Sequence, residues 1–486
     1  MTKELKILTN VFLNTTDNNV VPVNIYFDDA IIKIERISSK EFNWDDIKTF
    51  ESKLKLTSQF TANPIPGKSK IIDGKFNLVI PGAMDPHVHF DTPGFEFRDT
   101  FEHGSTAAAF GGVTTIIDMP CTSLPPVTTL TNFEEKLSIV KDRSLIDFAF
   151  WGGVRGNDFD QKINVEKNIN ELNEAGVASF KAYLISGMDT FKDLSFDQMK
   201  RVAEIISKIG KPLGVHAEDK NLIEARREEY KRNNQNSWEH YCNAQDSLAE
   251  EAAVKDMIKI GELTGAKVHI VHLSSELGLT SIQNAQQKGI NITAETCSHY
   301  LHFTQNDFKN DSIRNYLKTA PPVKFENDKQ ALWQGLKEGS LKFVTTDHAG
   351  CNPNEEKINE DFWKVYGGIP GVEHRVPHLI SEGFIKQKLN LNQTINLLST
   401  NVAEYFNLNK KGKIVEGYDA DFALINLWEK EIVKSQNMHS IGKYTPFEGT
   451  EFSCKIEKTI LRGKVIMDKE GKADEQIGYG KFIEVH

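Results

Sequence analysis

The sequence lacks the features of a secreted or membrane-embedded protein. Its five cysteines form no CxxC pair, and their odd number does not suit a complete disulfide framework. It contains no run of about 18 apolar residues, the length that a membrane span requires, and its first residues hold no apolar signal core. We therefore expect a cytoplasmic protein with no membrane partner.

An excess of basic charge is also missing. The 486 residues include 58 lysines and arginines against 68 aspartates and glutamates, which gives a net charge of −10. Nucleic acids and anionic membranes select basic surfaces, so neither is expected as the main partner. Charged residues make up 26% and hydrophobic residues 39% of the chain, as in a globular protein with a sizeable core. The length exceeds that of one ordinary domain.

What the sequence does contain is an alternation of short apolar runs with helical segments. Residues 202–209 carry an apolar stripe at helical spacing before Gly210, and 253–258 carry a second one. Eight β-branched apolar runs are of the kind that forms strands buried on both faces. They span 78–84, 113–119, 146–154, 177–185, 212–217, 267–273, 290–294 and 341–346. Eight strands alternating with helices predict a (β/α)8 barrel.

The two ends of the chain have a different, β-rich texture. Residues 1–75 show short apolar runs between Asn- and Asp-containing turns, and the polar segment 38–70 indicates a surface excursion. Residues 406–486 return to strand-like runs. The predicted fold class is therefore α/β: a TIM-like barrel over 76–405, with a small β-sandwich-like domain built by the N- and C-terminal segments.

Side chains that can bind metals follow several of the eight runs. Active sites of this barrel lie at the C-terminal ends of its strands, so these residues are expected to converge on one rim. Imidazole and carboxylate groups suit zinc and similar divalent ions. The residues are His87 and His89 after the first run, Lys181 in the fourth, His216 in the fifth, His272 in the sixth and Asp347 after the eighth.

The spacing of these residues suggests two metal sites. His87 and His89 are two residues apart, so both rings face the same side of a strand. With Asp347 they could hold one metal. His216 and His272 could hold a second.

Lys181 is the unusual member of the set, because a protonated lysine cannot bind a metal. Burial among cations would lower its pKa, and the neutral amine could then react with carbon dioxide. The resulting carbamate would supply an anionic ligand that bridges both metals. A single lysine at a strand end, or a lone His-x-His pair, commonly has no such role. The prediction therefore rests on the coincidence of all members at the same end of their strands.

At these positions the sequence resembles the cyclic amidohydrolases, which include allantoinases, dihydroorotases, and hydantoinases or dihydropyrimidinases. The resemblance covers residues 70–470 and implies a homodimeric or homotetrameric hydrolase that opens a small cyclic amide or ureide with two divalent metal ions, zinc being expected. The motifs that carry it are PGAMDPHVHF, GGVTTIIDMP, FKAYL, HAED, VHLSS, ETCSHYL, APP, TTDHAG and GGIPGVE.

The resemblance also implies a role for each residue of the set. Divalent metals lower the pKa of water, which would attack a ring carbonyl. Asp347 would carry the proton of that water to the leaving ring nitrogen. In the implied arrangement His87 and His89 bind the more buried metal, His216 and His272 bind the second, carboxylated Lys181 bridges them, and Asp347 is also a ligand.

The substrate is less closely constrained. Dihydroorotases carry an arginine two residues after the His-x-His pair, where this chain has Asp91, although Arg98 could reach in from the following loop. Hydantoinases carry a tyrosine shortly after the lysine, where this chain has Ser186. DMPCTSLPPVT, HAED and GGIPGVE are similar to allantoinases. We therefore predict an allantoinase-like enzyme, with dihydroorotase and hydantoinase or dihydropyrimidinase as alternatives.

A further expectation concerns the side chains around the substrate ring. Residues that could contact the ring, or could merely shape their loops, are Asp91, Thr122, His299, Pro321 and Gly368.

A non-catalytic scaffold on the same fold is the remaining alternative. Such relatives lose metal ligands, whereas this chain keeps the whole set.

Overall fold

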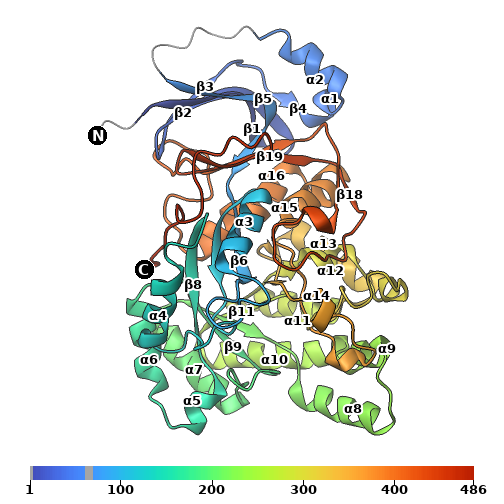
Figure 1. Cartoon of the computed structure of the whole chain (residues 1–486). Helices are drawn as coiled ribbons and strands as arrows, with labels where there is room; N and C mark the ends of the chain where they lie inside the picture. Colours follow the sequence, from blue (N-terminus) through green and yellow to red (C-terminus); the bar gives the residue numbers. More distant parts are fainter. Residues whose placement is uncertain (1–3, 61–68) are drawn as a thin grey trace.

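The computed structural model describes residues 4–60 and 69–486 and contains two large sheets of different construction. One is an open sheet, which lies at the top of Figure 1 and is built from the blue and red ends of the chain. The other is a parallel barrel below it, surrounded by helices. The predicted combination of a barrel with a small β domain shared by both chain ends is confirmed.

The barrel strands follow one another in chain order. From β6 to β12 each strand pairs in parallel with the next, β13 pairs with β14, and β15 returns to pair with β6. The seventh barrel strand is interrupted at Glu295, and the eighth at 346–347. The strands are β6 (Ala83–His89), β7 (Val113–Asp118), β8 (Asp147–Gly153), β9 (Ser179–Tyr183), β10 (Pro212–His216), β11 (Lys267–Ile270), β12 (Ile292–Ala294), β13 (Thr296–Cys297), β14 (Val344–Thr345) and β15 (His348–Ala349).

Helices cover the outside of the barrel. Within the described part of the chain, none combines the length and the apolar character needed to cross a lipid bilayer. The longer ones are α3 (Phe101–Phe110), α4 (Leu130–Val140), α6 (Val165–Glu174), α7 (Phe196–Ile209), α8 (Lys220–Arg232), α10 (Ser247–Thr264), α11 (Glu276–Gln287) and α13 (Glu326–Glu338). Shorter segments are α5 (Gly156–Asp160), α9 (Trp238–Ala244), α12 (Ser298–His302), α14 (Pro353–Glu356), α15 (Arg375–His378), η3 (Leu379–Ile385), α16 (Leu391–Ile395), η4 (Asn396–Thr400) and α17 (Asn401–Tyr405).

Helix α7 shows how local sequence sets the bounds of an element. Ser195 and Gln198 form a capping box at its start, and Gly210 has the left-handed φ of 81° that commonly ends a helix. The apolar stripe of 202–209 faces the core between them. The second predicted stripe, 253–258, lies in α10. Both helices predicted from apolar spacing are therefore present.

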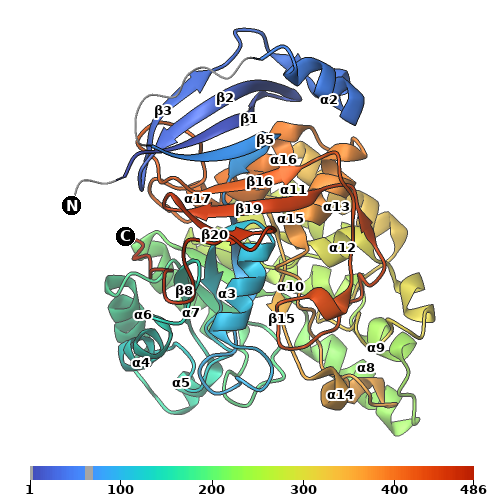
Figure 2. The same cartoon turned by 45° about the horizontal axis from the view of Figure 1, so that its top comes forward.

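The open sheet joins the two ends of the chain (Figure 2). Strand β5 pairs in parallel with β1 and antiparallel with β16, so the N- and C-terminal parts meet at this strand. The small strands β17 (Glu431–Ile432) and β18 (Glu451–Phe452) pair separately. The members of the sheet are β1 (Lys6–Thr16), β2 (Asn19–Phe27), β3 (Ile31–Arg36), β4 (Phe42–Asn43), β5 (Lys70–Pro81), β16 (Phe422–Asn426), β19 (Lys455–Leu461) and β20 (Lys464–Asp468).

The predicted first barrel run, 78–84, is divided between two strands. Its first part ends β5 of the open sheet, whereas Ala83 begins β6 of the barrel. At the break, a Cβ on Gly82 would lie 2.1 Å from the Thr114 hydroxyl oxygen, so the chain needs glycine to pass this close to β7. The residues on both sides of the break are buried and apolar, which is why the sequence pattern could not separate the two strands.

The segment predicted as a surface excursion, 38–70, is partly structured. It contains β4 and two short helices, α1 (Trp44–Ile47) and α2 (Phe50–Thr57), while 61–68 lie outside the described residues. Trp44 is buried, with its ring centroid 5.5 Å from that of Trp428 and 5.4 Å from that of Phe384. This aromatic contact fastens the segment to the C-terminal half of the chain.

A buried cluster of ionic side chains connects the barrel to the open sheet. Lys411 lies 3.0 Å from a carboxylate oxygen of Asp147 at the start of β8 and 2.7 Å from one of Asp421 just before β16. Arg462, in the turn between β19 and β20, also pairs with Asp147. All four side chains are largely buried, so each carboxylate depends on these cations for compensation.

We expect Lys411→Met to destabilise the protein by about 3–5 kcal/mol, because it leaves buried carboxylates without a partner. The midpoint of urea unfolding measures this change. The matched control is Lys413→Met, which breaks the exposed pair of Lys413 with Glu404 and should cost less than about 1 kcal/mol. Equal midpoints for the two variants would show that the cluster does not hold the two sheets together.

Candidate metal centre

The strand ends bring the predicted metal ligands together inside the barrel. His87, His89, Lys181, His216 and His272 are buried, and Asp347 is partly exposed. Parallel strands place these side chains at the same end of the barrel, as the sequence pattern predicted. His87 and His89 lie on β6, Lys181 on β9 and His216 at the end of β10, His272 follows β11, and Asp347 lies between β14 and β15.

Three of these side chains form a compact group. Oδ1 of Asp347 lies 3.0 Å from Nε2 of His87 and 3.1 Å from Nε2 of His89. One ligand atom from each residue lies within 4.8 Å of the others. Two imidazole nitrogens and a carboxylate oxygen at this spacing form a donor set that suits a divalent cation.

The other two histidines stand beside this group. The ring centroids of His216 and His272 are 4.6 Å apart, and that of His272 is 5.4 Å from that of His87. Nδ1 of His272 is buried without a hydrogen-bond partner among the described residues. A buried polar atom normally has a partner, so this free nitrogen indicates room for a ligand at the second position.

Lys181 is fully buried, and its amine has no hydrogen-bond partner among the described residues. Burial lowers the pKa of Lys181 to about 8, so a substantial fraction of the amine is neutral near that pH. An unpaired buried amine is costly, and carboxylation would turn it into an anionic oxygen donor for cations. The surroundings of Lys181 therefore fit the predicted pair of divalent ions, although the ligand roles themselves remain predictions.

Three of the histidines use their second ring nitrogen to contact another side chain. Such contacts select the tautomer and orient the ring, so that the other nitrogen is free for a cation. Glu295 and Glu218 were not singled out from the sequence, although they lie in the motifs ETCSHYL and HAED, each within a few residues of a predicted strand end. The contacts join His87 Nδ1 to Glu295 Oε1 at 2.5 Å, His89 Nδ1 to Thr122 Oγ1 at 3.1 Å, and His216 Nε2 to Glu218 Oε2 at 2.9 Å.

Three of the thirteen non-glycine residues with a positive φ in the described part of the chain lie at this centre. Asp91, His272 and Asp347 have φ values of 48°, 40° and 48°, in the left-handed region that favours glycine. Such conformations cost about 1–3 kcal/mol each and are retained at sites where the side chain must point in one direction. The strain thus supports a functional role for this part of the barrel.

The five residues predicted to contact the ring fall into two groups. Both carboxylate oxygens of Asp91 and Nε2 of His299 are buried and have no hydrogen-bond partner among the described residues. Burial lowers the pKa of His299 to about 4, so its ring is neutral near pH 7. These two side chains retain polar atoms that a bound molecule could use.

The remaining three are already engaged within the protein. Thr122 contacts His89, and the Pro321 carbonyl accepts hydrogen bonds from the Tyr300 and Thr319 hydroxyls. A Cβ on Gly368 would lie 2.8 Å from a backbone oxygen, so close packing alone explains this glycine. Contact of any of the five with a substrate remains a prediction.

Two side chains considered for substrate recognition are also held by protein groups. The Arg98 guanidinium donates to one Glu356 oxygen through Nε at 2.9 Å and Nη2 at 2.6 Å. The Ser186 hydroxyl accepts from the Met188 amide at 3.1 Å. The Arg98 guanidinium is therefore paired with a carboxylate, whereas the one accepted hydrogen bond leaves the Ser186 O–H able to donate.

Tyr183, which the sequence pattern did not assign to the site, stands within it. Its ring centroid lies 5.3 Å from that of His216 and 5.0 Å from the Lys181 amine. Its hydroxyl lies 3.1 Å from the Cys121 sulfur. The alternation of side chains along β9 could have shown this, since residues two apart on a strand share a face.

Comparisons with known proteins agree with this geometry. The chain is 34% identical over 424 residues to an allantoinase from Bacillus licheniformis, covering 85% of this chain and 91% of that one, and 32% identical over 403 residues to an allantoinase from Rubrobacter xylanophilus, covering 83% and 87%. The L-hydantoinase (dihydropyrimidinase) structure from Arthrobacter aurescens superimposes with a TM-score of 0.87 at 27% identity, covering 99% of this chain and 100% of that one. The model of the amidohydrolase family matches residues 78–466. The chain therefore belongs to the amidohydrolase family.

Proposed function

We propose that this protein is a binuclear metal-dependent hydrolase that opens a neutral cyclic ureide, as an allantoinase does. The observation that carries the proposal is the group of four buried histidines, one buried lysine and the partly exposed Asp347 at the strand ends. The similarity to allantoinases over most of the chain supports this ring chemistry. A non-catalytic scaffold is disfavoured, because every predicted ligand is retained.

The residues divide into two ligand sets with one shared member. Bound divalent metals would lower the pKa of water and polarise a ring carbonyl. Zinc is the proposed ion, since nitrogen and oxygen donors suit it, although they also serve other divalent metals. His87 and His89 with Asp347 would hold one ion, His216 and His272 would hold the other, and N-carboxylated Lys181 would contact both.

Asp347 is the proposed proton carrier. Burial alone would raise its pKa, but the neighbouring His87 and His89 keep the pKa of the carboxyl well below its usual range. The ionised carboxylate can accept a proton from the attacking water and donate it to the ring nitrogen as the C–N bond breaks. The products are a carboxylate and an amide or ureido group.

The absence of a free arginine at the expected positions favours a neutral substrate. Asp91 occupies the position of a carboxylate-binding arginine, and Arg98 is held by Glu356. A ring that carries a carboxylate, such as dihydroorotate, would lack a cationic side chain here. Hydantoinase or dihydropyrimidinase activity is the second candidate, because the Arthrobacter aurescens enzyme shares the whole fold at 27% identity.

Location and assembly are also part of the proposal. All five cysteines are free and buried, which suits a reducing compartment such as the cytoplasm. A homodimer or homotetramer is proposed from the family resemblance.

We expect Lys181→Ala to lower metal content and to reduce kcat/KM by more than about 100-fold, since the loss of outer contacts alone already costs about 10–100-fold. Metal analysis and ring-opening assays measure both quantities, and acetate or propionate should restore part of the activity. The control is Lys211→Ala, which removes a partly buried lysine that donates to backbone carbonyls. Full activity of Lys181→Ala without added acid would exclude the bridging role.

We expect Asp347→Asn to retain much of the metal but to lower kcat by about 10²–10⁴-fold, because an amide cannot carry the proton. Steady-state kinetics and metal analysis on the same preparation separate the two effects. Asp193→Asn, which breaks the pair of Asp193 with Lys220 near the barrel rim, serves as control. Turnover close to that of the unmodified protein would contradict the proton-carrier role.

We expect allantoin to give the highest kcat/KM in a panel with hydantoin, dihydrouracil and dihydroorotate. Dihydroorotate should be the poorest, because its carboxylate would meet Asp91 without an arginine partner. Initial rates for each ring at matched metal loading test the order. A clear preference for dihydroorotate would overturn the argument from Asp91 and Arg98.

A further inference from the structure

A chain of buried hydrogen bonds leads away from His87 through the interior of the barrel. Glu295 contacts His87 with one oxygen and Nε2 of His269 with the other, at 2.5 and 3.2 Å. Nδ1 of His269 lies 2.8 Å from the Thr293 hydroxyl oxygen, which lies 2.7 Å from the hydroxyl oxygen of Tyr405. His269 and Glu295 are fully buried, so these groups depend on one another for hydrogen bonds.

The chemistry of the linked groups determines which member of each hydrogen bond is the donor. An ionised carboxylate only accepts hydrogen bonds, so Nε2 of His269 donates to Glu295. Burial lowers the pKa of His269, and a neutral ring has one N–H. Nδ1 of His269 then accepts from the Thr293 hydroxyl at 2.8 Å, a shorter distance than the 3.3 Å to the competing Val268 carbonyl, and Thr293 in turn accepts from Tyr405. Every donor thus points from Tyr405 toward Glu295.

The same rule sets the tautomer of His87. Its Nδ1 must carry a proton to donate to Glu295, and its Nε2 faces Asp347. Glu295 also accepts from the Thr345 hydroxyl at 3.1 Å and from the His272 amide at 3.4 Å. Both of these donors contact Oε1, the oxygen that also holds His87, whereas His269 contacts Oε2. The contact with His269 therefore fixes the second oxygen and, with it, the rotation of the carboxylate plane.

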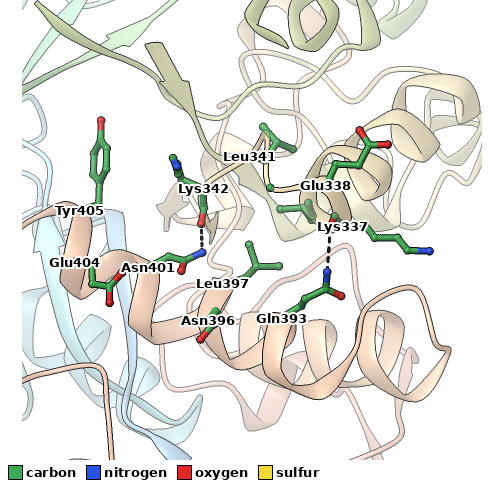
Figure 3. A pocket seen from close by; sticks show the side chains of 12 residues that line it. Lys337, Glu338, Leu341, Lys342, Gln393, Asn396, Leu397, Asn401, Glu404 and Tyr405 are labelled. Atoms are coloured by element: carbon green, nitrogen blue, oxygen red, sulfur yellow. Dashed lines mark hydrogen bonds between the residues drawn. The ribbon is translucent and has the colours of Figure 1, made fainter. Parts of the chain in front are cut away.

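The last member of this series of hydrogen bonds, Tyr405, lies at a surface groove outside the metal centre. Tyr405 ends α17 and lines this groove, whose volume is about 470 Å³, together with residues of α13 and η4. Figure 3 shows Tyr405 at one end of the groove, with its hydroxyl pointing away from the other labelled side chains. The side chain thus lines the groove while its hydroxyl is bonded to Thr293.

We propose that Tyr405, Thr293 and His269 are positioning residues that act through Glu295 to hold His87 with Nε2 ready to bind a metal ion. The inference rests on the proposed function, in which His87 is a ligand. Outer contacts of this kind orient a ligand ring before the metal arrives, which raises affinity without adding a ligand. Disturbance at Tyr405 would reach the metal centre through three intervening side chains.

The sharpest test compares Thr293→Val with Thr293→Ser. Valine keeps the shape of threonine but removes the donor to His269, whereas serine keeps the hydroxyl. We expect Thr293→Val to weaken the affinity for the zinc ion held by His87 by about 10-fold, and Thr293→Ser to keep most of that affinity. Chelator competition measures the affinity, and ¹⁵N-histidine spectra of the zinc-loaded protein should show the Nδ1–H signal of His87 displaced only in the valine variant.

Tyr405→Phe removes only the outermost hydroxyl. We expect a smaller loss of zinc affinity, about 3-fold, below the roughly 10–100-fold range of direct outer contacts. The matched control is Tyr26→Phe, which deletes a hydroxyl bonded to Glu35 in the open sheet and should leave zinc affinity unchanged.

The outcomes separate this inference from the proposed function. If Thr293→Val lowers the thermal stability of the metal-free protein while zinc affinity and the His87 signal stay unchanged, the residues are merely structural and the inference is wrong. If the affinity pattern holds but no cyclic ureide or amide is hydrolysed, the inference stands and the proposed function falls. Failure of the unmodified protein to bind zinc would overturn both.

Discussion

The arrangement of the metal centre depends on the hydrogen bonds of the buried Glu295 carboxylate. A charge inside the barrel is tolerated only when donors surround it, and Glu295 receives them from His87, His269 and Thr345 as well as from the His272 amide. One carboxylate thereby orients the ring of His87 and also holds the backbone of His272, a second predicted ligand. Because its other oxygen is tied to His269, the orientation extends to the hydrogen bonds behind the site.

The position of Glu295 follows from how the barrel closes. The seventh and eighth barrel strands are interrupted at Glu295 and at 346–347, where β12 gives way to β13 and β14 to β15. At these interruptions the backbone leaves the regular ladder, and Asp347 takes a left-handed φ of 48°. Regular strands would direct alternate side chains inward and outward. The interruptions instead let Glu295 and Asp347 both reach the same group of histidines.

Much of the architecture was predictable from local patterns. Apolar runs predicted most of the barrel strands, and apolar spacing with Gly210 predicted α7 and its end. The boundary between the open sheet and the barrel was not predictable, because residues 78–84 are buried and apolar in both. The packing of Trp44 against Trp428 was also not predictable, since these residues are far apart in sequence.

The candidate site shows the same division. The sequence by itself determined which ligand types are present and, through the two-residue spacing of His87 and His89 and the rule for parallel strands, that they gather at one rim. Only the tertiary structure decided that Glu295 and His269 stand behind His87, that Arg98 is occupied by Glu356, and that the Asp91 carboxylate is unpaired. The physical reason is that residue type and strand position are local properties, whereas the hydrogen-bond partner of a buried polar group is set by whichever distant segment packs against it.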